Sequence, residues 1–283
     1  NLITNPPRKA GVSARKQLPA KLVAVNETTP SRTALRVAMR RAAHQLLDRP
    51  LVLDDPYALR ILPAWSVPEL DQNGARETNP FGQAIRAFMV ARSRFAEDKC
   101  STFFQAGTRQ YVLLGAGLDT FSWRNPFHDQ GLTVFEIDHP ATQTWKRELI
   151  RQAALTEPAT TIYVPVDFER QSLADCLLAA GFHTDAPAFF AWLGVVPYLT
   201  LEAFRNTLRF LRGMAPGSGM ALDYALPREA LTDAESAVFD YIAARVARAG
   251  EPFQLAFTPQ QIRLELEAVG WTINEDVDAA ANS

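Results

Sequence analysis

Hydrophobic and polar positions along the chain change their spacing near residue 108. Before that point the spacing is helical: residues 33–48 carry apolar side chains on one face, and residues 81–107 are typical of one long helix that Gly107 ends. Between them, residues 54–62 predict a short helix with Pro56 in its first turn, and residues 63–80 read as loop. The first hundred residues are therefore expected to be helical.

After residue 108, short apolar runs of strand length alternate with helical segments. The strand candidates are residues 111–115, 132–138, 161–167, 187–199 and 219–227, and a last strand is expected to begin at Trp271 after a helix capped by Thr258. Such alternation is typical of an α/β fold in which helices cover both faces of a parallel sheet.

These changes of pattern divide the chain into three expected parts. Residues 1–30 contain several basic residues but no apolar core of the signal-peptide type, so a flexible arm is expected there. Residues 31–108 form the helical extension, and residues 109–283 form the ligand-binding α/β domain. The end of the chain, DVDAAANS, lacks the continuation expected after a strand at GWTI.

Composition and charge exclude several classes of function. The 283 residues are 47% hydrophobic and carry a net charge of −2, so no basic footprint for nucleic acid or an anionic membrane exists. No apolar run is long enough to span a bilayer. Cys100 and Cys176 have neither metal-ligand nor redox spacing, and the four histidines are scattered, so no metal site is expected. A reduced, cytoplasmic setting and a small-molecule partner are expected, whereas the oligomeric state stays open.

The turn in LLGAGLDT is the strongest candidate for a ligand site. In a doubly wound sheet, ligands lie at the carboxyl ends of the strands, where Gly115 and Gly117 would let the backbone approach closely. Asp138 follows Gly115 by 23 positions, near the offset at which an acid binds ribose hydroxyls. Two plainer readings remain: the glycines pack only, and Glu136 or Asp138 merely caps the next helix.

A dinucleotide and S-adenosylmethionine are the two ligand classes that suit a glycine turn and a ribose acid. Thr120 stands where a dinucleotide site has its third glycine, and Asp119 would repel a pyrophosphate. S-adenosylmethionine has no phosphate and carries two positive groups, so an acid in the turn favours it. The alternative is a nicotinamide-dependent oxidoreductase.

The segments LGAGLDTFSWR, VFEIDHP and VPVDFER resemble the leucine carboxyl methyltransferase family. They are most similar to its bacterial branch of S-adenosylmethionine-dependent methyltransferases, which includes polyketide O-methyltransferases. The similarity extends from SRTALRVAMRRAAH to FTPQQIRLELEAVGW. It implies a class I methyltransferase, Rossmann-like fold: a mostly parallel seven-stranded sheet preceded by a helical extension that covers the active site.

The resemblance also implies roles for individual residues at the cofactor site. Gly115 and Gly117 would lie against the methionine part of the cofactor, and Asp138 would bind the ribose. Asp167 and Phe168 would hold the adenine, the acid through its exocyclic amine.

Basic residues of the helical extension complete this implied site. Arg92 matches the arginine that pairs with the cofactor's carboxylate, with Arg94 as the alternative, and a guanidinium suits that group because it binds bidentately. Either Arg36 or Arg41 would supply a further contact. Leu193 stands where the eukaryotic members have a glutamate, so one polar contact with the cofactor is lost or replaced.

The expected reaction is an O-methylation by in-line displacement, in which the enzyme mainly aligns the reactants. A carboxylate acceptor is already ionised at neutral pH and is the simpler reading, whereas a hydroxyl would need a base such as His139, His183 or Tyr198. No residue is assigned a catalytic role. The aromatic candidates for the acceptor site, each with core packing as the alternative, are Tyr198, Trp123, Phe103 and Phe104. A non-catalytic relative that only binds cofactor is the other alternative.

Overall fold

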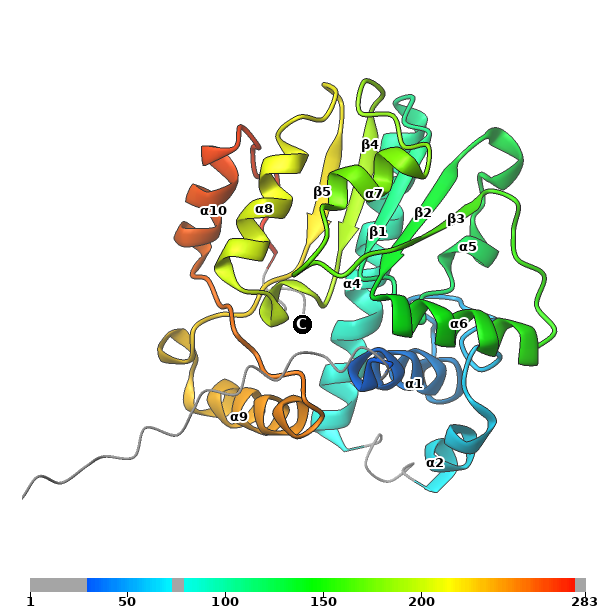
Figure 1. The fold of residues 1–283 in the computed structure, drawn as a ribbon. Helices are drawn as coiled ribbons and strands as arrows, with labels where there is room; N and C mark the ends of the chain where they lie inside the picture. Colours follow the sequence, from blue (N-terminus) through cyan, green and yellow to red (C-terminus); the bar gives the residue numbers. More distant parts are fainter. Residues whose placement is uncertain (1–29, 73–78, 278–283) are drawn as a thin grey trace, which may run out of the picture.

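The computed structural model describes residues 30–72 and 79–277, so the expected arm lies outside the described residues apart from its last position. At its centre is a parallel five-stranded sheet with the order β3-β2-β1-β4-β5 (Figure 1). The strands are β1 (Gln110–Leu114), β2 (Thr133–Asp138), β3 (Thr161–Pro165), β4 (Ala188–Trp192) and β5 (Gly219–Leu222). Strand order reverses between β1 and β4, which in such sheets marks the ligand crevice.

Helices cover both faces of this sheet and a further group lies at the carboxyl ends of its strands (Figure 1). The α-helices are α1 (Arg32–Leu47), α2 (Val67–Gln72), α4 (Pro80–Gln105), α5 (Phe121–Arg124), α6 (Pro140–Gln152), α7 (Leu173–Ala179), α8 (Leu201–Leu211), α9 (Asp233–Arg248) and α10 (Pro259–Ala268). The short 3-10 helices are η1 (Ala64–Ser66), η2 (His128–Gln130), η3 (Val196–Tyr198) and η4 (Arg228–Ala230).

The buried apolar side chains form three clusters that follow this layering. One face of the sheet packs on α7, α8 and α10, and the other packs on α4 and α5. All five residues of β4 are buried, as expected for a strand covered on both faces. The third cluster contains residues of α1, the 58–62 turns and α6, together with Leu118. It therefore packs α1 and these turns against α6 and the segment that follows β1.

Several sequence expectations are confirmed, including the helix cap at Thr258, where Thr258 and Gln261 form a reciprocal capping box. Others are wrong. Residues 54–62 form turns rather than a helix, η1 and α2 lie where a loop was expected, and α9 was not predicted.

The strand expected at Trp271 does not form, and the described residues contain five strands rather than seven. Trp271 instead packs against the core, and its indole N–H donates to the Leu211 carbonyl at 3.2 Å. The apolar side chains of this segment are thus used to cover α8, without a ladder to β5.

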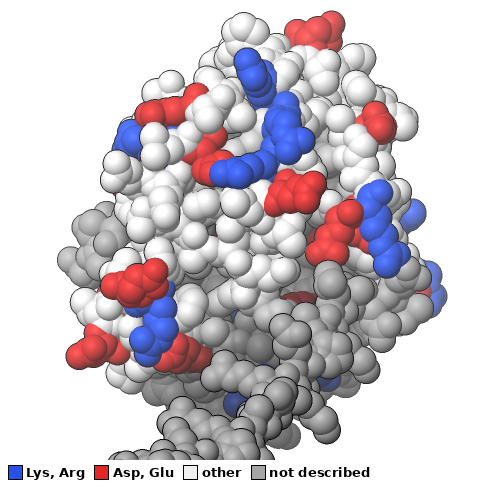
Figure 2. Space-filling view, turned by 60° about the vertical axis from the view of Figure 1, so that its left-hand side comes forward, with Lys and Arg blue, Asp and Glu red and all other residues white. Residues whose placement is uncertain are grey.

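No helix in the described ranges combines the length and the apolar character needed to cross a bilayer. On the face shown in Figure 2, Lys and Arg lie in small groups with Asp and Glu, and uncharged areas separate the groups. Cross-helix pairs such as Arg205–Glu265 are of this kind. Such a surface gives no extended field of one sign on that face.

Candidate functional site

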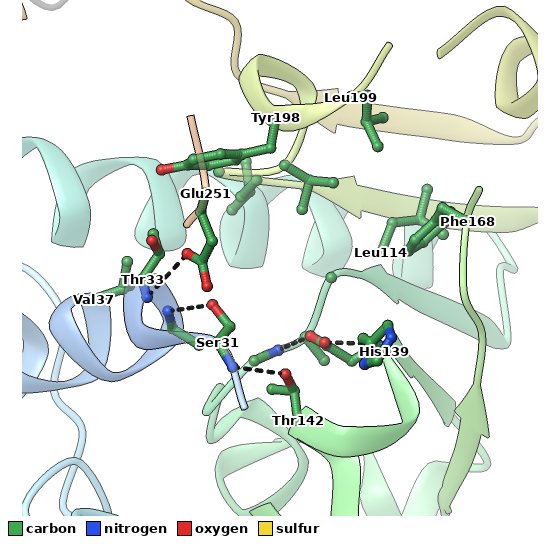
Figure 3. A pocket seen from close by; sticks show the side chains of 18 of the residues that line it. Ser31, Thr33, Val37, Leu114, His139, Thr142, Phe168, Tyr198, Leu199 and Glu251 are labelled. Atoms are coloured by element: carbon green, nitrogen blue, oxygen red, sulfur yellow. Dashed lines mark hydrogen bonds between the residues drawn. The ribbon is translucent and has the colours of Figure 1, made fainter. Parts of the chain in front are cut away.

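A pocket of about 750 Å³ lies at the carboxyl ends of the strands, at the switch point between β1 and β4. Its walls come from the turns after β1 to β4, from α1 and α4, and from the 250–254 segment after α9. In Figure 3, Tyr198, Glu251 and Thr33 lie together on one side of this pocket, and His139 and Phe168 lie on the other. The volume is within the range of small-molecule sites.

The glycine turn after β1 lines the pocket between these two sides. Gly115 and Gly117 have φ values of 74° and 52°, which other residues rarely adopt. A Cβ on Gly115 would lie 2.2 Å from Cγ2 of Val195, and one on Gly117 would lie 3.1 Å from Cβ of Ala34. Glycine is therefore required at Gly115 on two grounds, conformation and space.

Asp138 ends β2 and faces this turn. Its carboxylate accepts hydrogen bonds from the backbone N–H of Gly117 and, at 2.7 Å, from that of His139. Burial raises the pKa of Asp138 to about 6, although both hydrogen bonds act in the opposite direction. His139 is the N-cap of α6, with its ring nitrogen beside the N–H of Ala141.

Asp167 and Phe168 follow β3 and line the same side of the pocket as Asp138. The Asp167 carboxylate accepts from the Glu169 N–H at 3.0 Å and lies 3.6 Å from Arg170. The turn after β3 thus presents an acid beside an aromatic ring.

Arg92 reaches the pocket from α4, whereas Arg94 does not. The Arg92 guanidinium pairs with Asp223 and lies against Gly194, where a Cβ would be 2.8 Å from Nη2. Its Nε is buried and has no hydrogen-bond partner within the described part of the chain. Arg94 pairs with Asp98 on the exposed face of the helix, so of the two alternatives it is Arg92 that lines the pocket.

Asp223 is a site residue that the sequence reasoning missed. It follows β5 and accepts from the Gly194 N–H as well as from Arg92, so it fixes the guanidinium relative to the turn after β4. The available signal was its position, because an acid directly after a parallel strand lies at the ligand edge of the sheet.

Arg41 lines the pocket and Arg36 does not. Arg41 pairs with the buried Asp55 and with the partly buried Asp119, and it donates to the buried Thr120 hydroxyl at 3.0 Å. Although burial acts to raise it, Arg41 holds the pKa of the Asp119 carboxyl well below its usual range. The Asp119 charge that the sequence analysis set against a pyrophosphate is therefore paired with Arg41, although Asp119 also lines the pocket.

The opposite side of the pocket comes from segments far apart in the sequence. The Glu251 carboxylate accepts from the backbone N–H groups of Arg32 and Thr33, at 3.1 and 3.2 Å, and so caps α1 from outside (Figure 3). Tyr198 lies beside Thr33, and burial raises its pKa to about 12. Apolar side chains that line the pocket include Val37, Leu193 and Val195.

The first turn of α1 is also attached to the cofactor side, since the Ser31 N–H donates to the Thr142 hydroxyl of α6 at 3.1 Å. The start of α1 therefore bridges the pocket between α6 and Glu251 (Figure 3).

Other candidates for the acceptor side are not at the pocket. Trp123, Phe103 and Phe104 do not line it: Trp123 donates to the Thr156 carbonyl, Phe103 packs on Phe189, and Phe104 stacks on Phe127. His183 is exposed and also lies elsewhere. His139 and Tyr198 remain as pocket residues.

The six residues expected to hold a cofactor all line this one pocket: Arg92, Gly115, Gly117, Asp138, Asp167 and Phe168. They come from α4 and from the ends of β1, β2 and β3.

Known proteins resemble this chain over most of its length. The chain is 33% identical over 266 residues to "Putative S-adenosyl-L-methionine-dependent methyltransferase YktD" of Bacillus subtilis, an alignment that covers 87% of each protein. It is 35% identical over 207 residues to a protein of the same description, without the name YktD, from Saccharopolyspora erythraea, covering 72% of this chain and 70% of that one.

Solved structures share the fold at low sequence identity. A crystal structure described as a putative methyltransferase from Thermobifida fusca has a TM-score of 0.52 at 16% identity, covering 94% of this chain and 93% of that one. A DUF574 family protein from Streptomyces avermitilis has a TM-score of 0.53 at 18% identity, covering 85% and 83%. The model of the leucine carboxyl methyltransferase family matches residues 34–212. The chain therefore belongs to the leucine carboxyl methyltransferase family and is an enzyme of the methyltransferase class.

Proposed function

We propose that this methyltransferase moves the methyl group of S-adenosylmethionine to an oxygen of a small molecule, either a carboxylate or a hydroxyl. S-adenosylmethionine dependence follows from the family and from the relatives named above. The single observation that carries the residue assignment is the convergence of the six expected residues on one pocket at the strand switch point.

The residues present fit this cofactor in three respects. The backbone turn at Gly115 leaves no room for a side chain, and Asp138 is a partly buried acid held in place by two backbone N–H donors. Arg92 has an Nε without a hydrogen-bond partner among the described residues. An acid that accepts from neutral hydroxyls, and a guanidinium that binds a carboxylate, are the groups a ribose and an amino-acid end require.

Each residue is assigned to a part of the cofactor. Asp138 accepts from the ribose hydroxyls, and Asp167 with Phe168 holds the adenine. Arg92 binds the amino-acid carboxylate, while Asp223 fixes the orientation of Arg92. Leu193 supplies only apolar contact where a glutamate would accept a hydrogen bond.

The chemistry that the cofactor supplies is an activated methyl group on a sulfonium. The protein contributes alignment, which in well-oriented systems is worth about 7–11 kcal/mol. We assign this alignment to the turns after β1 and β4, which touch through Gly115 and Val195, and to residues 31–108, which we propose act as a cover over the site. Bridging of the pocket by the start of α1 would exclude water from the acceptor.

Calorimetry with S-adenosylhomocysteine and with NAD tests the cofactor class. We expect saturable binding of S-adenosylhomocysteine and none of NAD. The reverse result would favour the oxidoreductase alternative, whereas binding with no labelled product from a methyl-labelled donor and a cell extract would favour a non-catalytic relative.

A further inference from the structure

Glu251 lines the pocket, and among the described residues its carboxylate accepts from two backbone N–H groups and forms no ion pair with a Lys or Arg side chain. It lies outside the part of the chain that the family model matches. Each of its oxygens accepts one N–H from the start of α1, which leaves further lone pairs available. Figure 3 shows its side chain between Tyr198 and Ser31, inside the pocket.

Each arginine that lines the pocket already lies next to a carboxylate. Arg41 pairs with Asp55 and Asp119, Arg92 pairs with Asp223, and Arg170 lies 3.6 Å from Asp167. Arg36 is near enough for Glu251 to influence its pKa, but it does not line the pocket and donates to the Arg245 carbonyl. A negatively charged acceptor would therefore meet Glu251 without a matching cation among the described pocket residues.

Hydrogen-bonding capacity leads to the same conclusion as charge. Two ionised carboxylates can only accept, so neither can bind the other, and bringing like charges together costs free energy. A hydroxyl can donate to Glu251 and keep its oxygen free for methylation. The sequence alone favoured a carboxylate acceptor because it showed no base, but Glu251 supplies an acceptor for a hydroxyl proton at this wall.

We propose that Glu251 is the residue that sets acceptor specificity, by excluding anionic acceptors and by accepting a hydrogen bond from a neutral hydroxyl-bearing one. This proposal rests on the proposed function, since it concerns the acceptor part of the same pocket. Val37, Leu193 and Val195, which line the same pocket, suit an apolar ring or chain that carries the hydroxyl.

The test compares two probes of one shape, 2-naphthol and 2-naphthoate, binding to the full chain saturated with S-adenosylhomocysteine at pH 7.5. The measured quantity is the ratio of their dissociation constants by fluorescence titration. We expect the wild type to prefer 2-naphthol, and E251Q to shift the ratio toward 2-naphthoate at least about tenfold, which corresponds to about 1.4 kcal/mol.

Two further variants separate charge from shape. E251D keeps the charge and should keep the wild-type preference. E169Q removes one negative charge from the cofactor side of the pocket and should leave the ratio unchanged.

Equal binding of the two probes by the wild type, no saturable binding of either, or an unchanged ratio in E251Q would overturn the proposal. The wild-type ratio tests it independently of any variant. Failure of the wild type to bind S-adenosylhomocysteine would instead overturn the proposed function, because that measurement precedes the addition of either probe.

Discussion

The two sides of the pocket are built in different ways. The cofactor side consists of turns directly after β1, β2 and β3, and its key contacts involve backbone N–H groups and buried charges. The acceptor side is assembled from α1, η3 and the segment after α9, and Glu251 holds it together through two hydrogen bonds to the start of α1. A sheet fixes the first side, whereas the second can change without altering the strands. Such a division suits an enzyme family in which one donor serves many acceptors.

The largest expected effect concerns the buried charges below the cofactor side. Replacing Arg41 by Met removes the cation shared by Asp55 and Asp119 and leaves Asp55 with Arg124, at 3.3 Å, as its remaining cation among the described residues. Breaking a buried charge group by removing one partner costs about 3–5 kcal/mol. Urea unfolding measures the change. The matched control, Arg36→Met, removes a cation that donates to the Arg245 carbonyl and lies near Glu251 but is not fully buried, and it should lower the free energy of unfolding far less. Equal decreases in the free energy of unfolding for the two variants would mean that the buried charge pairs of Arg41 do not stabilise the protein more than the contacts of Arg36 do.

The next effect is on cofactor affinity. Replacing Asp138 by Ala removes the proposed acceptor of the ribose hydroxyls, and the loss of a charged hydrogen-bond acceptor should weaken S-adenosylhomocysteine binding by about 1–3 kcal/mol. Calorimetry gives the dissociation constant. Glu169→Ala, an exposed acid on the same side, serves as control. An unchanged constant in Asp138→Ala would contradict the ribose assignment.

A smaller effect is expected where the two sides meet, at Arg92. Lysine keeps the charge but lacks the planar fork, so Arg92→Lys should raise the dissociation constant of S-adenosylhomocysteine by roughly tenfold. Arg94→Lys, two residues along the same helix and exposed, should have no effect. If the two variants exchange behaviour, the carboxylate of the cofactor does not lie at Arg92.

The smallest effect is a pH dependence that separates binding from stability. Because burial raises the pKa of Asp138 to about 6, its ionised form is lost as pH falls through 6, and S-adenosylhomocysteine affinity should decrease by at most about tenfold per pH unit. The same raised pKa means that protonation favours the folded protein, so the contribution of Asp138 to stability increases over that interval. Asp138→Asn should remove the pH dependence of binding; its persistence would point to another group.

Sequence reasoning reached the cofactor side because the rules for parallel sheets are local. Gly115 and Asp167 follow strands and Asp138 is the last residue of one, and the carboxyl ends of parallel strands meet at one edge. The pairing of Asp119 could not be predicted, because its partner Arg41 lies 78 positions earlier and no local pattern shows that pair.

The acceptor side could not be predicted in the same way. Thr33, Tyr198 and Glu251 come together only through the packing of α1 against a segment 218 positions away. Trp123 and the Phe103–Phe104 pair were equally good candidates by residue type, and they lie in the core or at another surface. Residue type without topology does not separate a core aromatic from a pocket aromatic.

The 2.2 Å between the position of a Cβ on Gly115 and Cγ2 of Val195 has a consequence for redesign. Val195 occupies the volume that any side chain at position 115 would require, so the two turns interlock. Replacing Val195 by a smaller residue to enlarge the pocket would also open a void against Gly115, which we propose contacts the cofactor. We therefore expect substitutions of Val195 to change both the range of acceptors that the enzyme uses and its affinity for the methyl donor.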